Sequence, residues 1–400
     1  MMRVTIVAGA RPNFMKISPI IKAINGARAT GHALKYRLVH TGQHFDRKMS
    51  GDFFDQLGIP EPDINLECGG GSQAEQTAAV MVSFERELEA NRPDIVIVVG
   101  DVTSTLACTI TAKKLCIPVA HVEAGIRSGD MTMPEEINRI VTDSICDHFF
   151  TTTDHAGNLL KASGVEESRI HFVGNAMIDT LLQNLERIEV PACRDEYGLE
   201  AGKYFLLTLH RPANVDDPAK LREYLDAILA GTDNGRVVFP VHPRTRMTLE
   251  AMKFADPNLI QIEPLGYLEF IWLLKHAKAV ITDSGGITEE ATVLNIPCLT
   301  LRDSTERPET VELGTNELIG TDPKNLAPHL KKLSSGSWKQ GTIPELWDGH
   351  ASERIVATLL ELSKCESGGS DISAIQTNNE NRSWAAKPFS GSEIVTLPCD

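Results

Sequence analysis

The 400-residue chain has no excess of positive charge and no long apolar run. Its 39 Lys and Arg are outnumbered by 54 Asp and Glu, giving a formal net charge of −15, so neither nucleic acid nor a membrane surface is expected as a partner. No stretch reaches the roughly 18 consecutive apolar residues of a membrane helix, and the first residues do not read as a signal peptide. We therefore expect a cytoplasmic protein that binds anions through locally placed donors.

Several motifs are also missing. The eight cysteines include no C-x-x-C pair and no Cys/His spacing typical of zinc, so neither a disulfide framework nor a metal site is expected. Neither G-x-G-x-x-G nor G-x-x-x-x-G-K-[ST] occurs, which argues against NAD and against P-loop chemistry. The sequence predicts no cofactor.

Apolar, β-branched segments alternate with helical patterns along most of the chain. The strands that this pattern predicts are residues 4–8, 36–40, 95–99, 119–122, 204–209, 236–241, 279–282 and 298–301. Their hydrophobicity is continuous rather than alternating, which indicates parallel sheets covered by helices on both faces. We predict an α/β protein with two doubly wound domains, residues 1–174 and 175–351, and a hinge close to Gly174.

The C-terminal region divides into a helix and a tail. Residues 352–364 carry Ile355, Leu359 and Leu362 at helical spacing, so we expect a packed helix that crosses back to the first domain. Residues 366–400 are rich in Ser, Gly and Asn and lack a sustained period, which predicts a mobile tail. The tail could still dock locally through three apolar side chains, Trp384, Phe389 and Ile394.

Charged residues follow three strands of the first domain. Arg11 and Lys16 come after the first strand, at the carboxyl edge where open α/β sheets bind ligands; two cations there suit phosphates, and solvated loop charges are the alternative. Asp101 and Glu123 end two further strands. Glu135 stands beside a Pro that begins a helix, so it can project toward the same edge.

Crowded carboxylates raise at least one apparent pKa, which lets a site keep a general acid and a general base near neutral pH. Asp101, Glu123 and Glu135 are therefore candidate catalytic acids. Ordinary capping and ion pairing with Arg127 and Arg139 is the alternative.

The second domain offers a histidine and a glycine turn. His210 follows the first strand of that domain and can exchange a hydrogen bond with a substrate oxygen, unless it is structural. Ser284, Gly285 and Gly286 join a buried strand to a helix; free N–H groups and the helix dipole there favour a pyrophosphate, and a tight turn without ligand is the alternative. Glu290 can accept from ribose hydroxyls, and Arg307 can add positive charge.

Together these blocks resemble the non-hydrolysing UDP-N-acetylglucosamine 2-epimerases over about residues 3 to 364. The blocks, in chain order, are GARPNFMK, HTGQHFD, HVEAGIRSGD, PEEINR, TLHRPANVD, TDSGGITEEA and RDSTERPE. The resemblance implies two Rossmann-like domains facing across a cleft, the GT-B-type architecture of one glycosyltransferase superfamily, with a UDP-sugar between them. It also implies a homodimer that uses neither NAD nor a catalytic metal.

The family chemistry removes the carbon 2 proton and UDP to give 2-acetamidoglucal, then adds UDP back after reprotonation from the opposite face. By resemblance, Asp101, Glu123 and Glu135 are the essential acids. His210 is the fourth catalytic residue and stabilises the leaving group. The remaining matches bind the UDP-sugar or its leaving pyrophosphate: Arg11, Lys16, Ser284, Gly285, Gly286 and Arg307, with Phe270 at the base and Glu290 at the ribose. Helical spacing equally suits Phe270 as a core residue.

Two departures from the family stand out. Many bacterial members read His-Arg-Arg-Glu-Asn where this chain has His210-Arg211-Pro212-Ala213-Asn214, and in that branch the substrate activates the enzyme from a neighbouring pocket. Cys68-Gly69-Gly70-Gly71 falls near that pocket and brings no basic residue. We therefore predict weak or absent substrate activation.

Alternative functions of the same fold are a UDP-2,3-diacetamido-glucuronate 2-epimerase, a hydrolysing 2-epimerase, a glycosyltransferase and a catalytically silent binding module.

Overall fold

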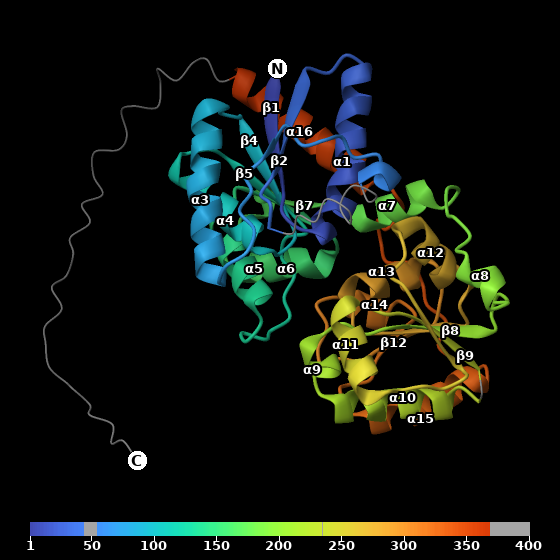
Figure 1. Cartoon of the computed structure of the whole chain (residues 1–400). Helices are drawn as coiled ribbons and strands as arrows, with labels where there is room; N and C mark the ends of the chain where they lie inside the picture. The colour runs from blue at the N-terminus through green and yellow to red at the C-terminus, as the bar shows by residue number, and fades with distance from the viewer. Residues whose placement is uncertain (44–53, 234, 369–400) are drawn as a thin grey trace, which may run out of the picture. The chain divides into compact units, whose positions relative to one another are not determined.

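The structure is a computed structural model that describes residues 1–43, 54–233 and 235–368 (Figure 1). Residues 44–46 of the HTGQHFD block therefore lie outside the described residues. The same holds for residues 369–400, which make up most of the predicted tail and include its three docking candidates.

Seven strands in the described part of the chain form the first sheet, and every pairing in it is parallel. Their spatial order is β3 (Ile64–Asn65), β2 (Leu34–His40), β1 (Met2–Ala8), β4 (Ile95–Val99), β5 (Val119–Val122), β6 (His148–Thr151) and β7 (Ile170–Phe172). The connecting helices are α1 (Arg11–Ala29), α3 (Gln73–Ala90), α4 (Thr103–Lys114), α5 (Pro134–Ile145) and α6 (Asp154–Ala162), followed by α7 (Ala176–Asn184) and the short α8 (Cys193–Glu196).

Both faces of this sheet are buried, as the continuous apolar runs predict. Ile6 and Ile97 pack into one apolar cluster with Phe14 of α1. Val7 and Val96, which point to the opposite face, pack into another cluster with α3 and α4.

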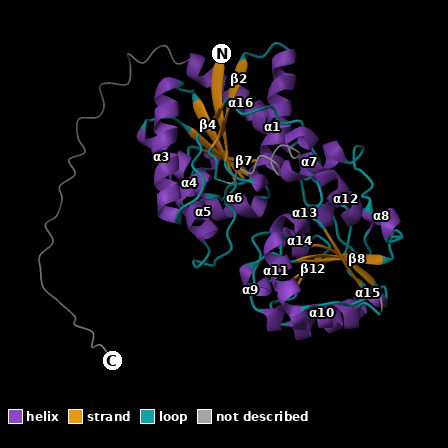
Figure 2. Ribbon diagram, in the orientation of Figure 1, coloured by secondary structure: helices purple, strands orange, loops and turns teal. Residues whose placement is uncertain are grey.

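The second sheet repeats the plan with six parallel strands. Its order is β10 (Leu259–Ile262), β9 (Arg236–Pro240), β8 (Tyr204–Thr208), β11 (Ala279–Thr282), β12 (Cys298–Thr300) and β13 (Asn316–Leu318). Its helices are α9 (Pro212–Val215), α10 (Pro218–Gly231), α11 (Pro243–Met252), α12 (Tyr267–His276), α13 (Gly285–Val293), α14 (Pro308–Glu312) and α15 (Leu326–Ser334). Figure 2 shows strands and helices alternating in both sheets, so the α/β prediction is confirmed.

The strand predictions need corrections of three kinds. The predicted strands 4–8 and 36–40 each begin two residues earlier than expected, at Met2 and Leu34. The predicted strands that begin at 204, 236 and 298 each end one residue earlier than expected, at Thr208, Pro240 and Thr300. Five strands were not predicted at all: β3, β6, β7, β10 and β13. These have two to four residues, and each includes a polar side chain that interrupts its apolar run.

The chain after the second sheet contacts residues of the first. Trp347 donates from Nε1 to the carbonyl of Thr152 at 3.0 Å. Helix α16 (Ala351–Gly368) begins where the fully buried Asp179 accepts the N–H groups of Ala351 and Ser352. The helix is longer than predicted: residues 366–368, expected in the tail, continue it, because nothing before Gly368 interrupts helical hydrogen bonding.

Position 174, at the predicted hinge, requires a glycine for two reasons. Its φ is +90°, which L-residues rarely adopt, and a Cβ there would lie 2.0 Å from the carbonyl oxygen of Leu346. The segment around 346 therefore passes directly against the turn that follows β7. The domain boundaries themselves stay a prediction.

None of the helices in the described residues is both long and apolar enough to span a lipid bilayer.

Candidate active site

The turn after β4 packs Gly100 against two charged side chains. Gly100 has φ +67°, and a Cβ there would lie 3.2 Å from Lys16 Nζ and 3.3 Å from Glu123 Oε2. Because Asp101 follows directly, the turn brings together three of the predicted site residues. The β1–α1 turn is fixed to the same place: Asn13 accepts the N–H groups of Gly9 and Ala10 and donates to the carbonyl of Val99 at 2.9 Å. Arg11 begins α1 at this turn.

Arg139 holds Asp101. Its Nε and Nη2 both donate to Asp101 Oδ2, at 3.0 and 2.6 Å. Burial would raise the pKa of Asp101, but Arg139 and Lys16 outweigh it, so the pKa lies below the usual value. Asp101 is therefore a carboxylate at neutral pH.

Glu123 occupies an unusual backbone position at the end of β5. Its φ is +74°, in the left-handed region, and the N–H groups of Glu123 and Ala124 both donate to the carbonyl of Phe150, at 3.0 and 3.1 Å. The side chain forms ion pairs with Lys16 and with Arg307. Burial is the main reason that the pKa of Lys16 falls to about 8.

Helix α5 presents adjacent acids with different surroundings. Glu136 accepts the N–H groups of Ser128 and Gly129 and pairs with Arg139 at 2.7 Å. Glu135 has no hydrogen bond or ion pair to any described residue and is half-buried. The charge of Glu135 helps to raise the pKa of Arg211, together with Glu306 and Asp283. Burial and the neighbouring Arg302 outweigh these acids, so the pKa of Arg211 is lowered.

Arg307 links this group to the second sheet. It donates from Nε to Glu289 Oε1 at 2.6 Å while it contacts Glu123 through Nη2. Glu289 Oε1 also accepts from Asn175 Nδ2 at 2.8 Å. Arg307 is therefore fixed between two buried side chains, Glu123 just after β5 and Glu289 on α13.

The Ser-Gly-Gly turn lies at the start of α13, as predicted. Ser284 is the N-cap residue, but its hydroxyl does not cap the helix. A Cβ on Gly285 would lie 3.5 Å from Arg302 Nη1, and one on Gly286 would lie 3.2 Å from Met177 Cε. The first-turn N–H groups and an arginine thus occur together, an arrangement suited to an anion.

Glu290 and Phe270 lie on neighbouring helices of the second sheet. Burial raises the pKa of Glu290 to about 7, and an interaction with Tyr267 partly offsets this. Phe270 is half-buried and packs against the apolar cluster that contains Leu268 and Ile271. That packing agrees with a core role for at least part of the ring.

His210 is oriented by a buried carboxylate. Its Nδ1 lies 2.8 Å from Asp283 Oδ1, the imidazole is 48% exposed and Asp283 is fully buried. Asp283 also accepts from the Arg211 N–H at 2.9 Å and from Asn214 Nδ2 at 3.1 Å. Burial would raise the pKa of Asp283, but the hydrogen bonds, led by that of His210, lower it. Because a carboxylate only accepts, the Nδ1 of His210 carries a proton.

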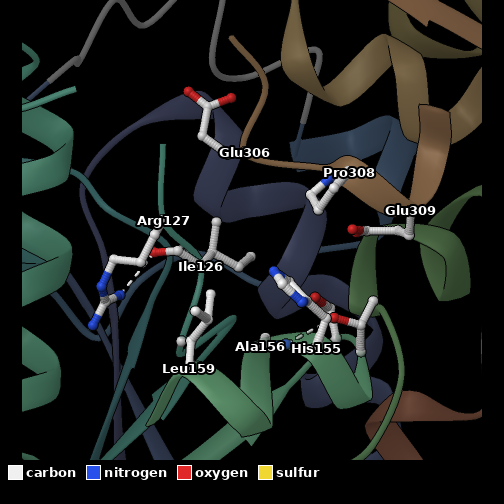
Figure 3. Close-up of a pocket in the computed structure, with 11 residues that line it drawn as sticks. Ile126, Arg127, His155, Ala156, Leu159, Glu306, Pro308 and Glu309 are labelled. Atoms are coloured by element: carbon white, nitrogen blue, oxygen red, sulfur yellow. Dashed lines mark hydrogen bonds between the residues drawn. The ribbon is translucent and has the colours of Figure 1, made fainter. Parts of the chain in front are cut away.

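A small pocket lies beside these groups without including the candidate acids. It is lined by residues 125–127, 152, 153, 155, 156, 159, 306, 308 and 309 (Figure 3). Its volume of about 10 Å³ holds about one water molecule. A sugar nucleotide does not fit there.

The structure gathers Lys16, Asp101, Glu123 and Arg307 into one network. His210 pairs instead with Asp283, and Glu135 makes no hydrogen bond or ion pair to a described residue. The sequence named Arg139 as an ion-pair partner of the acids, and its pair with Asp101 is present. Sequence reasoning missed three other residues that hold this network: Asn175, Glu289 and Glu306. All but Asn175 stand inside the motif blocks already singled out, next to or near a predicted residue.

Comparison with known proteins identifies the family. A family model described as UDP-N-acetylglucosamine 2-epimerase matches residues 27–360. The chain belongs to this family. The UDP-N-acetylglucosamine 2-epimerase of Methanocaldococcus jannaschii is 41% identical over 371 residues, which cover 90% of this chain and 99% of the relative.

A crystal structure of the M. jannaschii epimerase in complex with UDP-GlcNAc and UDP matches with a TM-score of 0.80 at 40% identity, covering 90% of this chain and 100% of that one. The UDP-2,3-diacetamido-2,3-dideoxy-D-glucuronate 2-epimerase of Pseudomonas aeruginosa is 40% identical over 365 residues, covering 90% of this chain and 100% of the relative. Membership makes the chain an isomerase with the two-domain GT-B-like fold of the epimerases.

Proposed function

We propose that this epimerase inverts carbon 2 of UDP-N-acetylglucosamine, giving UDP-N-acetylmannosamine through loss and re-addition of UDP. The observation that carries the proposal is the Lys16–Glu123–Arg307 network beside Asp101. In this network, carboxylates that can transfer a proton lie next to cations that can bind a diphosphate. Elimination of UDP needs both groups at one place.

The leaving diphosphate meets cations and backbone donors. Lys16, Arg307, Arg11 and His210 supply charge or donors, and the first turn of α13 at Ser284, Gly285 and Gly286 supplies N–H groups. Lys16 and Arg307 already bind the Glu123 carboxylate. An incoming diphosphate therefore competes with Glu123 for both cations, and the exchange releases Glu123 for proton transfer.

Proton exchange on two faces of carbon 2 needs two placed groups. Asp101 and Glu123 come from neighbouring strands and Glu135 from the start of α5, so these acids approach from different elements. Phe270 packs on the uracil and Glu290 accepts from the ribose in this proposal.

A second candidate substrate is UDP-2,3-diacetamido-glucuronate, because the P. aeruginosa relative named for it is 40% identical, close to the 41% of the M. jannaschii enzyme. A hydrolysing 2-epimerase and a glycosyltransferase remain further candidates.

Proton NMR of UDP-N-acetylglucosamine with the enzyme in heavy water separates these candidates. We expect deuterium at carbon 2 and a mixture of the two UDP-sugar epimers. Free N-acetylmannosamine would indicate the hydrolysing reaction. Inert substrate would contradict the proposal, and the diacetamido-glucuronate and then transferase acceptors would be assayed next.

We also propose that the enzyme is a homodimer in the cytoplasm, on the basis of the family resemblance. Ile137 and Ile140 of α5 are 45% and 37% exposed, which makes this helix a candidate contact surface. Light scattering on the full chain measures the mass, and a monomer at all concentrations would contradict the dimer.

A further inference from the structure

A buried histidine–aspartate pair lies directly behind the candidate acids. His121 is on β5, two residues before Glu123, and its side chain is 1% exposed. Its Nε2 is 2.8 Å from the carbonyl oxygen of Gly100, and its Nδ1 is 2.7 Å from Asp143 Oδ1 on α5. One imidazole thus joins the turn between β4 and Asp101 to helix α5, which begins beside Glu135.

The partners of His121 determine where its protons are. A backbone carbonyl only accepts, so Nε2 must donate to Gly100. Asp143 also accepts from the Gly125 N–H and from Arg127, and its interactions with His121 and Arg127 lower its pKa although burial alone would raise it. Because Asp143 is therefore ionised and acceptor-only, the imidazole is held between two acceptors, the Gly100 carbonyl and the Asp143 carboxylate.

The second oxygen of Asp143 holds the chain on the far side of Glu123. Oδ2 accepts from the Gly125 N–H at 3.1 Å and from Arg127 Nη1 at 2.7 Å. The Asp143 carboxylate thus contacts residues before and after Glu123, whose backbone is left-handed. Such a conformation persists only when its surroundings fix it.

We propose that Asp143 and His121 are positioning residues: they set the spacing between the Asp101 and Glu123 carboxylates by tying the Gly100 carbonyl and the 121–127 segment to α5. This proposal rests on the proposed function, because the spacing of Asp101 and Glu123 matters only if both carboxylates take part in epimerisation. Both side chains are buried, at 1% and 3% exposed, so neither is placed to contact a ligand directly. Their effect is on the geometry of turnover and not on binding of UDP.

The test compares Asp143→Ala with Asp143→Asn. The Ala variant loses all three bonds, and we expect kcat to fall about 100-fold, the scale of a misplacement of about 1 Å, with the KM and the UDP dissociation constant unchanged. Asn keeps an oxygen for Gly125 and Arg127 and an N–H for a neutral His121, so we expect it to restore most of kcat.

Asp147→Ala is the matched control. Asp147 also holds backbone, by accepting the Val119 N–H at 2.8 Å and pairing with Lys113, but it lies at the opposite end of β5 from Glu123. We expect its loss to lower the melting temperature without lowering kcat.

The wild-type protein provides a readout that does not depend on folding of a variant. In protein with ¹⁵N-labelled histidine, we expect the hydrogen on Nε2 of His121 to exchange slowly with solvent, because the side chain is 1% exposed and donates to the Gly100 carbonyl. A rapidly exchanging Nε2 hydrogen, or an Asp143→Ala variant with normal kcat, would overturn the proposal. Wild-type enzyme that incorporates no deuterium at carbon 2 of either candidate UDP-sugar would overturn the proposed function and this inference with it, whereas normal exchange in both proteins would overturn the positioning role alone.

Discussion

The affinity for UDP should fall above pH 8 because of one buried lysine. Burial lowers the pKa of Lys16 from 10.5 to about 8, so the folded protein loses this cation as the pH rises through 8. With a pKa of 8, about nine-tenths of Lys16 is charged at pH 7 and about one-tenth at pH 9. If UDP binds only to the charged form, its dissociation constant rises about tenfold between pH 7 and pH 9.

Isothermal titration of UDP at several pH values in that range measures the effect. The control is Lys16→Arg, whose guanidinium stays charged throughout, so whatever its absolute affinity, it should change little between pH 7 and pH 9. Any ionisation of UDP itself affects the dissociation constants of both proteins equally, so it cancels in the comparison. A dissociation constant that rises equally in wild type and Lys16→Arg would refute the assignment of Lys16 to the diphosphate.

Three further predictions concern turnover. Asp101→Asn, Glu123→Gln and Glu135→Gln should each slow epimerisation at least about 100-fold while changing the UDP dissociation constant by much less; a near-normal rate, followed by NMR, removes that residue from acid/base catalysis. His210→Ala should lower kcat by about 10- to 100-fold through lost stabilisation of the leaving group, and an unchanged rate would make the histidine structural. The enzyme should turn over UDP-N-acetylmannosamine without added UDP-N-acetylglucosamine, and a strict requirement for that addition in initial-rate assays would contradict the absence of substrate activation.

The fold was predictable where apolar runs are long. The predicted strands at 95–99, 119–122 and 279–282 coincide with β4, β5 and β11. β3 has only two residues and β13 only three, so their pairing with a neighbouring strand, not their own composition, makes them strands. Short edge strands depend on tertiary contacts that a local pattern does not contain.

The positions of the site residues were predictable from the sequence, but the ion pairs and hydrogen bonds between them were not. Strand ends and a helix start located Asp101, Glu123 and Glu135, because the carboxyl edges of parallel sheets are identified by the strands themselves. The pairing of Glu123 with Arg307 spans 184 residues. No spacing rule connects residues so far apart, and the same is true of the bond between Asn175 and Glu289.

Local rules fail most clearly at Glu123, and the failure points to the site. A left-handed conformation costs a residue with a Cβ about 1–2 kcal/mol, and nothing in His-Val-Glu-Ala-Gly predicts it. The structure offsets this cost with backbone bonds to Phe150 and with ion pairs to Lys16 and Arg307. A glycine at position 123 would relieve the backbone but would remove the carboxylate, so the fold keeps a strained residue where only a charged side chain serves the chemistry.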